Sequence, residues 1–481
     1  MLGRDFIRNA SIASTMSAFS NIWKIKELRS RIVFTLALIA LCRLIAIVPT
    51  PGVNAKAMAD MVNSQAGAAG GLMGMFDLFT GGALARCSVG TLSIWPYINA
   101  SIIIQLMTAI IPALEKLARE GEPGRQKITQ ITRYLTLVLC AGQSFAIARW
   151  LESAQSLGLT SQTLVPMRGI SFEILTVVAM TSATMLVMWL GEQITERGIG
   201  NGMSIIIMVN ICARLPLALW ETAMKFRSSP GQPAEFSIFT LVFLLALAFV
   251  VFAGTILLTD GVRKVPLHTA RGSVGGRVVG GQSTYLPLRV NFGGVMPIIF
   301  AGPILTVLGW VFAHFGREPG EGVAEFWSKF EFIRAFGRAL RDGYSNPTAS
   351  YLVCYALLIL FFSFFWVATQ FNAVRIADDL KRSNGYVPGI RPGLPTAEFL
   401  DLTMTRVTFI GAAGLILIAI IPSLLTKEGR IPFGIASFFG GTSLLIIVGV
   451  ALDTMRQIES YLVMRSYDGF LKHGRIRGRN G

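Results

Sequence analysis

Apolar stretches of about the length of a membrane crossing alternate with short polar segments along nearly the whole chain. A hydrocarbon core of ~30 Å is crossed by ~20 mostly apolar helical residues. Ten stretches approach this length, near residues 32–48, 88–111, 131–149, 171–190, 203–220, 237–258, 293–315, 350–371, 403–422 and 434–455. The pattern therefore predicts an all-α polytopic membrane protein with ten transmembrane helices.

The distribution of basic residues predicts the orientation of these helices. If the N-terminus is cytoplasmic, the segments on that side carry about twice as many lysines and arginines as the segments on the other side. Basic loops are retained on the cytoplasmic side of a membrane. We therefore expect both ends of the chain to be cytoplasmic, as tails 1–31 and 456–481.

The number of predicted helices suggests two related halves. Five helices precede residues 222–236 and five follow them. Successive halves with an odd number of crossings run in opposite senses, which permits an inverted repeat about a pseudo-two-fold axis in the membrane plane. We expect pseudo-symmetric halves 32–221 and 237–455, joined by an external hinge loop at 222–236, to enclose a central pore.

Composition supports the membrane class and restricts the chemistry. Of the 481 residues, 53% are hydrophobic and 15% are charged, too few charges for the surface of a soluble protein of this length. The net charge of +16 suits basic loops that face an anionic leaflet or an acidic partner such as ribosomal RNA. The five cysteines and three histidines are scattered, so we expect no disulfide framework, metal, cofactor or catalytic group.

Charge is scarce within the predicted helices. None holds a carboxylate or a histidine near its middle, whereas ion-coupled transporters usually need such groups along their path. This argues against coupled transport. Arg43 lies near the outer end of the first helix, and we expect its side chain to extend to the membrane surface.

Some local features have two interpretations. Residues 64–86 are rich in Gly, Ala, Met and Phe, and a short helix there either folds back to membrane depth or rests on the outer surface. The residues alone favour the surface helix, because interfacial amphipathic helices are common. Ile94 and Ile98, four residues apart, share a helix face, as do Ile207 and Ile211, and such pairs more often face lipid or core than a pore. Pro96 is expected to break the hydrogen bonding near the start of its helix.

Two predicted cytoplasmic segments, 259–292 and 372–406, are long and basic. In the first, β-branched runs flank a Gly-rich middle, which predicts a protruding hairpin. Connections of this length are usually functional. Basic protrusions suit the docking of a large anionic or acidic partner.

Several strings resemble the SecY family, the channel subunits of the bacterial protein-export translocon. They are VPTPGVN at 48–54, WPYINASIIIQLMT at 95–108, EGEPGRQKITQITRYLTL at 120–137, WLGEQITERGIGNG at 189–202, QSTYLPLRVN at 282–291, ADDLKRSNGYVPGIRPG at 377–393 and FGGTSLL at 439–445. These strings follow the order of the family and extend from the first predicted helix to the last.

The resemblance implies a passive channel, without enzymatic activity, that passes unfolded secretory polypeptides and releases hydrophobic segments sideways into the membrane. It implies a pore ring at Ile94, Ile98, Ile207, Ile211, Ile299 and Ile446. A plug in segment 70–85 would include Leu72, Met75, Phe76, Leu78, Phe79 and Leu84. Polar residues of a lateral gate would be Asn99, Gln143 and Asn291, which otherwise read as ordinary interhelical hydrogen-bonding groups.

The resemblance also implies partners and a location. The loop residues that match positions contacting the motor ATPase SecA and the ribosome are Arg263, Lys264, Arg271, Lys381, Arg382 and Arg391. Expected partners are SecE-like and SecG-like small subunits, signal sequences, unfolded preproteins and membrane lipids, at the bacterial cytoplasmic membrane. The 259–292 loop departs from the family in being richer in Gly and poorer in Lys, and segments 60–72 and 316–349 are longer.

Two other function classes need residues that the chain does not offer. A secondary transporter of a small solute would need charged or ion-coordinating groups near the middle of the membrane, and none is visible in the predicted helices. An intramembrane enzyme would need a catalytic constellation within them, which is also not visible. The transporter is the alternative to the channel.

Overall fold

A helix lies at each of the ten predicted crossings. The computed structural model describes residues 25–65, 77, 79–153, 163–166, 168–225, 238–269, 272–274, 277–279, 283–315, 349–428, 436 and 441–473. The helices at the crossings are α3 (Lys26–Ile45), α6 (Trp95–Ile110), α8 (Glu122–Ser153), α9 (Ile170–Arg197), α10 (Gly202–Lys225), α11 (Ile238–Asp260), α12 (Met296–Phe315), α15 (Ala349–Gln370), α17 (Leu394–Glu428) and α19 (Thr442–His473). The predicted all-α membrane fold is therefore confirmed.

Length and composition alone single out fewer crossings. In the described part of the chain, five helices are long and apolar enough to span a membrane, or six if α6 and the following α7 (Pro112–Arg119) count as one bent span. In α10 the apolar part, Gly202–Leu217, is shorter than a full crossing.

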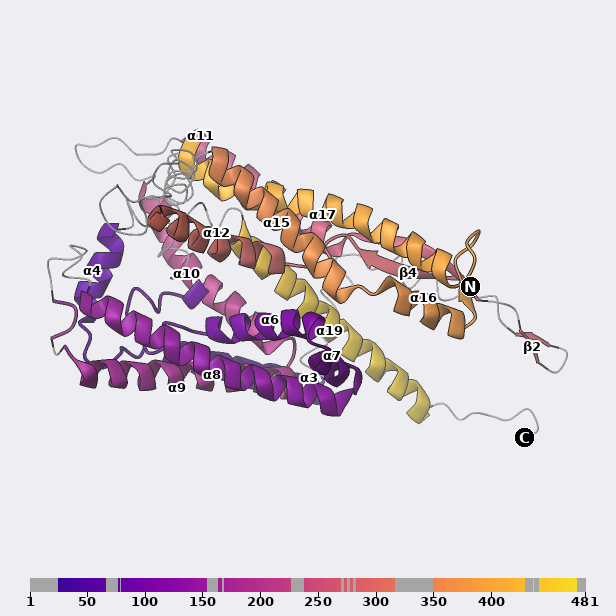
Figure 1. The fold of residues 1–481 in the computed structure, drawn as a ribbon, viewed down its shortest axis with the longest axis horizontal. Helices are drawn as coiled ribbons and strands as arrows, with labels where there is room; N and C mark the ends of the chain where they lie inside the picture. The colour runs from indigo at the N-terminus through magenta and orange to yellow at the C-terminus, as the bar shows by residue number, and fades with distance from the viewer. Residues whose placement is uncertain are drawn as a thin grey trace.

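The helices pack in two groups that follow the order of the chain (Figure 1). In the first group, α8 packs against α6 and α9, and α9 also packs against α3 and α10. In the second group, α15 packs between α12 and α17, and α11 contacts α17 and α19. The main helix contact between the groups is α10 against α19. The predicted hinge begins inside α10, and residues 226–237 lie outside the described residues.

The start of α6 corrects one prediction. The helix begins at Trp95 rather than near residue 88, and Pro96 occupies its first turn. Proline is well placed there, because the first N–H groups of a helix have no partner within the helix. Pro96 thus starts the helix instead of breaking it, and residues 81–94 form a chain of turns in front of it.

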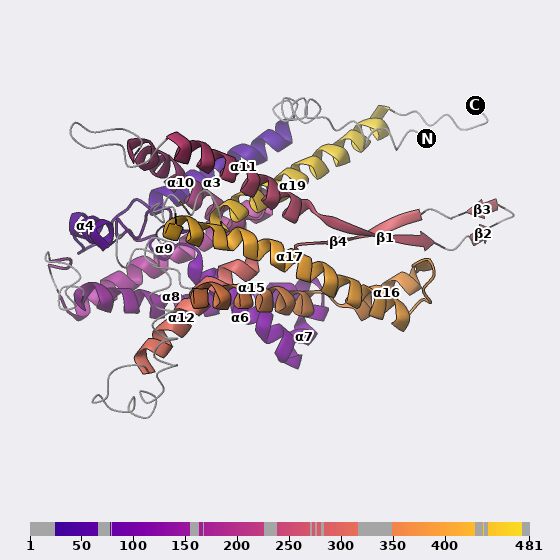
Figure 2. The ribbon, with the colours of Figure 1, turned by 90° about the horizontal axis from the view of Figure 1, so that it is seen from above.

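A hairpin projects from the end of the molecule opposite α4 (Ala55–Gln65), as Figure 2 shows. Strand β1 (Val262–Thr269) pairs antiparallel with β4 (Ser283–Arg289), and β2 (Gly272–Val274) pairs with β3 (Arg277–Val279). The predicted protruding hairpin is confirmed. Strand β5 (Gly385–Tyr386) joins the other edge of β1, so the two long basic loops form one unit.

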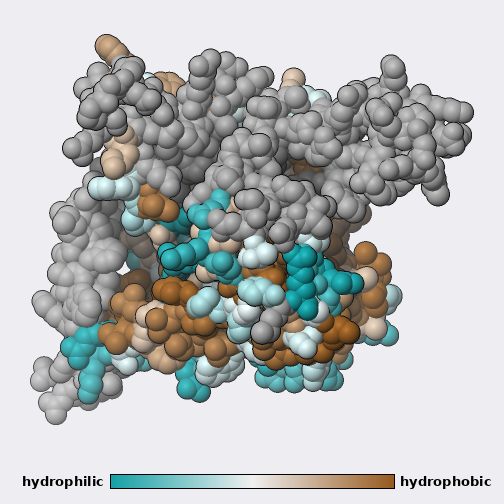
Figure 3. All heavy atoms as spheres, turned by 90° about the vertical axis from the view of Figure 1, so that its left-hand side faces the viewer, coloured by the Kyte–Doolittle hydropathy of each residue, from teal (hydrophilic) through white to brown (hydrophobic). Residues whose placement is uncertain are grey.

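Large apolar side chains on the outside of the helices face the surroundings. On α11, Phe239 is 81% exposed, and Phe249 and Leu257 are each 74% exposed. Exposed apolar side chains of this kind suit contact with lipid. Figure 3 views the end that carries α4, where hydrophobic side chains lie mainly in the lower half, with polar ones above, between and below them.

Candidate functional site: an isoleucine ring between two cavities

The six isoleucines predicted for the pore ring belong to one hydrophobic cluster. They come from the start of α6, from α10, from α12 and from α19: Ile94, Ile98, Ile207, Ile211, Ile299 and Ile446. Ile207 is partly buried and the other five are buried. Helices from both packing groups therefore meet at these side chains.

Two cavities lie on either side of this cluster. The apolar cavity, of about 430 Å³, is lined by Phe79, Leu84, Trp95 and Trp150, among others. The second cavity, of about 360 Å³, is the more polar of the two and is called the polar cavity: hydrophilic side chains such as Glu196 line it together with apolar ones.

The side chains that separate the cavities are Ile98, Ile207 and Ile299, which line both of them. Ile94 lines the apolar cavity, and Ile446 lines the polar one. Ile211 is fully buried and lines neither, so it packs behind the constriction. The result is an hourglass whose waist is made of aliphatic side chains.

An ion pair stands in the wall of the polar cavity. Arg133 of α8 donates to both carboxylate oxygens of Glu192 of α9, from Nε at 2.9 Å and from Nη2 at 2.8 Å. A bidentate arginine–carboxylate pair has a defined geometry. It fixes α8 against α9 beside the waist and keeps this cavity hydrophilic.

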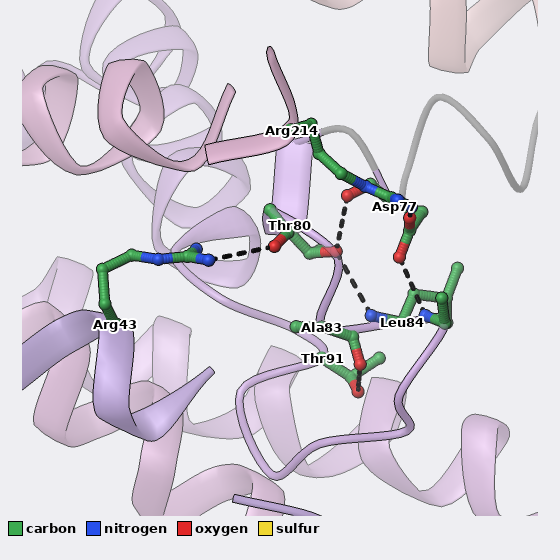
Figure 4. A network of polar contacts seen from close by, with 9 residues as sticks. Arg43, Asp77, Thr80, Ala83, Leu84, Thr91 and Arg214 are labelled. Atoms are coloured by element: carbon green, nitrogen blue, oxygen red, sulfur yellow. Dashed lines mark hydrogen bonds and ion pairs between the residues drawn. The ribbon is translucent and has the colours of Figure 1, made fainter. Parts of the chain in front are cut away.

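The segment in front of α6 is anchored by a buried charge that the sequence analysis missed. Asp77 is fully buried and forms an ion pair with Arg214 of α10. Its Oδ1 accepts a hydrogen bond from the N–H of Ala85 at 2.8 Å, and its carbonyl accepts one from Gly82 at 2.9 Å. Thr91 donates to the carbonyl of Ala83 at 3.3 Å (Figure 4). The segment thus folds around one carboxylate.

Arg43 corrects a second prediction. Its side chain does not extend to the membrane surface: Nη1 donates to Asn210 Oδ1 and Nη2 donates to the carbonyl of Gly81, each at 3.2 Å. Asn210 in turn donates to Ser93 Oγ at 3.0 Å. In Figure 4, Arg43 and Arg214 reach the segment from different sides. The sequence-based prediction considered charge only within the predicted helices, so it missed this buried network around Asp77.

A sequence signal for this network was present. Arg43 and Arg214 each lie in a predicted helix, and Asp77 is the only acidic residue in the Gly-rich string 64–86. A charge in an apolar environment is costly unless it is paired with an opposite charge. Contact between Asp77 and one of the two arginines could therefore have been predicted from the sequence.

The predicted plug residues are partly described. Phe79 is buried, belongs to the ring cluster, and lies 5.8 Å from Trp95 between ring centroids. Leu84 is half-buried and lines the apolar cavity. Because Asp77, Phe79 and Thr80 are buried, a helix resting on the outer surface does not fit this end of the segment. The other predicted plug residues, Leu72, Met75, Phe76 and Leu78, lie outside the described residues.

The three polar residues predicted for the lateral gate lie on different elements. Asn99 is on α6, Gln143 is on α8 beside the apolar cavity, and Asn291 lies between β4 and α12. Gln143 Oε1 and Asn291 Nδ2 are buried without a hydrogen-bond partner among the described residues. None of the hydrogen bonds found in the described ranges joins two of the three side chains.

The predicted docking residues are exposed. Arg263 and Lys264 lie on β1, Lys381 and Arg382 end α16 (Ala373–Arg382), and Arg391 follows β5. The pairing of β1 with β5 brings their two loops together. Arg271 lies outside the described residues. Among the described side chains, no group of three or more His, Cys, Asp or Glu could hold a metal ion.

Comparisons with known proteins agree on one family. The SecY family model matches residues 88–455. The chain is 39% identical to the protein translocase subunit SecY of Chlamydia muridarum over 471 residues, which covers 96% of this chain and 100% of the relative. It is 38% identical to the SecY subunit of Thermotoga maritima over 466 residues, covering 96% and 99% of the two chains.

Solved structures agree on the fold. A structure of a protein-conducting channel matches with a TM-score of 0.54 at 15% identity, covering 90% of this chain and 92% of the other. A structure reporting on the plug domain of SecY matches with a TM-score of 0.53 at the same identity and coverage. The family model covers most of the chain, and the relatives match it over nearly their full length. The chain therefore belongs to the SecY family.

Proposed function

We propose that this chain is a protein-conducting channel, which passes unfolded polypeptides across a membrane and releases hydrophobic segments sideways into it. The observation that carries the proposal is the waist of Ile98, Ile207 and Ile299 between two cavities. Branched apolar side chains make a seal that can adapt to different passing residues without binding any of them tightly. A narrow hydrophobic constriction also excludes water and ions when nothing passes.

The segment containing Asp77 and Phe79 is the plug of the resting channel. It reaches the ring cluster through Phe79 and is held by Arg214 and Arg43. Opening requires this segment to move away from the isoleucine cluster, and therefore requires those polar contacts to be broken.

The lateral gate is the seam between α6 and α8 on one side and α12 and α15 on the other. Gln143 and Asn291 carry unpaired polar atoms there, and a buried unpaired group costs about 1–3 kcal/mol. We expect leucines at Asn99, Gln143 and Asn291 to shift the gate equilibrium and to change which signal sequences are accepted. Export of precursors with weak signal sequences measures this, and unchanged export in the triple variant would contradict the assignment.

The hairpin and the α16 loop are the cytoplasmic docking surface. Exposed basic residues there suit a motor ATPase of the SecA type or ribosomal RNA, and energy for movement comes from these partners rather than from the channel. SecE-like and SecG-like subunits complete the complex. Both ends of the chain are cytoplasmic, and the halves 32–221 and 237–455 open about the hinge at 222–236.

The test is reconstitution of the chain with its small subunits in vesicles. We expect uptake of an unfolded secretory precursor that depends on SecA and ATP, and no uptake of the same precursor held folded. The alternative, a secondary transporter, draws support from the buried pair of Asp77 and Arg214. Gradient-driven uptake of small solutes without precursor uptake would overturn the channel in favour of the transporter.

A further inference from the structure

Helix α19 contacts three parts of the molecule that the proposed function treats separately. It carries Ile446 and Val450 of the ring cluster, packs against α10 of the other helix group, and packs against α11, which leads into the hairpin. One rigid element thus reaches from the waist to the base of the docking surface. From Ile446 to Arg456 the helical rise is ~15 Å.

One face of α19 is attached to the first helix group. Ile446, Val450, Thr454, Gln457 and Tyr461 are spaced by three or four residues and share this face. The N–H of Gly200 donates to Gln457 Oε1 at 2.8 Å. One turn further on, Tyr461 accepts a hydrogen bond from an arginine of α3 and lies beneath its guanidinium group.

Apolar packing reinforces these polar contacts. Leu28 of α3 and Ile199 are both 4% exposed, and Ile458 and Leu462 of α19 pack against them. This part of α19 therefore belongs to the same small core as the start of α3 and the turn between α9 and α10.

That turn, residues 198–202, is held tightly and leads directly into α10. Gly200 adopts a φ of 82°, which favours glycine, and the N–H of Gly202 donates to Thr195 Oγ1 at 2.9 Å. A Cβ on Gly202 would overlap the carbonyl oxygen of Gly191. Ile207, in the waist, lies five residues into the same helix, ~7 Å along its axis. A shift at Gly200 is therefore carried to the waist.

The adjacent face of α19 is attached to the base of the hairpin. Arg456 pairs with Asp260, the last residue of α11, and with Asp453 on its own helix. The neighbouring Gly261 accepts a hydrogen bond from the N–H of Val290 at 2.8 Å, which closes the base of the β1–β4 hairpin. A displacement of the hairpin thus bears directly on Arg456.

We propose that Gln457 and Arg456 are positioning residues that couple partner docking on the hairpin to the spacing of the isoleucine waist. Arg456 senses the hairpin base, α19 transmits its displacement, and Gln457 passes it to the 198–202 turn and hence to α10. Ile446 moves with the same helix. This inference rests on the proposed function, since it needs a partner that docks on the hairpin and a channel that opens.

The first experiment compares two variants at one position in vesicles containing the complete complex. Gln457→Glu keeps an oxygen that can accept from Gly200, whereas Gln457→Leu removes it. Three quantities are measured: SecA binding to the vesicles, SecA- and ATP-dependent precursor uptake, and thermal stability of the purified complex. For Gln457→Leu we expect unchanged SecA binding and uptake lowered about tenfold, within the usual range of coupling between sites. Gln457→Glu is expected to behave as the unaltered chain.

The second experiment exchanges charges across the hairpin base. The Arg456–Asp260 pair is partly exposed, with side chains 34% and 64% accessible, so its static contribution to stability is small. Arg456→Asp and Asp260→Arg are each expected to lower uptake several-fold at unchanged SecA binding. The double exchange is expected to restore uptake in part, because it re-forms the pair between positions 456 and 260 but places a carboxylate beside Asp453 on the same helix.

Several results would overturn the inference. Equal uptake by Gln457→Leu and Gln457→Glu would show that the acceptor oxygen does not matter. If SecA binding fell by as much as uptake, Gln457 and Arg456 would be docking residues rather than positioning residues. If the double exchange of Arg456 and Asp260 were as inactive as its single variants, the link between α19 and the hairpin base would be contradicted. If Arg456→Asp does not fold, the comparison of Gln457→Leu with Gln457→Glu tests the inference by itself. Failure of the unaltered chain to bind SecA or take up precursor would instead contradict the proposed function.

Discussion

Asp77 shows how a single buried side chain organises its surroundings. Its carboxylate is fully buried, and Arg214, at 27% side-chain exposure, supplies the opposite charge. Removing one partner from a buried pair leaves an unbalanced charge, whereas removing both does not. The pair therefore contributes more to holding the proposed plug segment in one place than to overall stability.

We expect Asp77→Asn to loosen the plug. Arg214 then lacks its buried counter-ion, which should destabilise the resting arrangement by up to about 3 kcal/mol, the low end of the range for a buried pair because Arg214 is partly exposed. The resting ion leak through reconstituted channels should therefore rise. The double variant Asp77→Asn with Arg214→Gln should leak less than Asp77→Asn alone. Glu173→Gln, at the Arg149–Glu173 pair that links α8 and α9, is the matched control, because its carboxylate is also largely buried. If this control leaked as much as Asp77→Asn, the idea that the Asp77–Arg214 pair holds the proposed plug segment closed would be contradicted.

The waist residues make a separate prediction. Ile207→Ser or Ile299→Ser places a hydroxyl where both cavities meet, so water and ions should enter more easily. Conductance of the resting channel is expected to rise in planar bilayers. Ile174→Ser, on an exposed face of α9 at 59% exposure, should not change it. Equal conductance in waist and control variants would show that the seal lies elsewhere.

At the scale of elements, the junction of α9 and α10 depends on close backbone approach. A side chain on Gly202 would meet the backbone of Gly191, whereas a Cβ added to Gly142, in the middle of α8, would have nothing within 4 Å. The same substitution at these two glycines should therefore have opposite effects.

We expect Gly202→Ala to destabilise the complex by about 1–3 kcal/mol through overpacking. Gly142→Ala should be neutral or stabilising by up to ~1 kcal/mol, because alanine favours the helix. Thermal unfolding of the purified complex in detergent measures both. Comparable losses from the two substitutions would mean that the tight junction does not limit stability.

At the scale of the whole molecule, exposed basic residues of two loops lie together at one end. The hairpin and α16 loop present exposed basic residues at one end, and α4 lies at the other (Figure 2). Electrostatic docking at the hairpin end should be strongest at low ionic strength, because salt screens exposed charges.

Reversing charges on the docking surface should weaken partner binding. For Arg263→Glu, Lys264→Glu and Arg391→Glu we expect weaker binding of SecA and ribosomes, with a shallower dependence on salt than the unaltered chain. Equilibrium binding to vesicles at several salt concentrations provides the measurement. Lys56→Glu on α4 serves as the control, and an equal effect there would point to a general charge effect rather than a docking surface.

The sequence predicted the elements better than their ends. Every predicted crossing contains a helix, since runs of apolar residues report directly on burial in lipid or protein. The start of α6 was misplaced because residues 88–94 are as apolar as a helix although they form turns. The hairpin was recognised from β-branched runs around glycines, but its pairing with β5, more than ninety residues from the end of β4, was not.

The hydrophobic pattern by itself determined the class of the protein, the positions of its helices and the hairpin, because these depend on local composition and on the length of a bilayer crossing. Helical spacing alone left the isoleucines as ordinary core residues. Only the tertiary structure set three of them between two cavities, paired Asp77 with Arg214 and turned Arg43 inward. Those outcomes depend on which helices become neighbours, and pairing of distant side chains leaves no periodic trace along the chain.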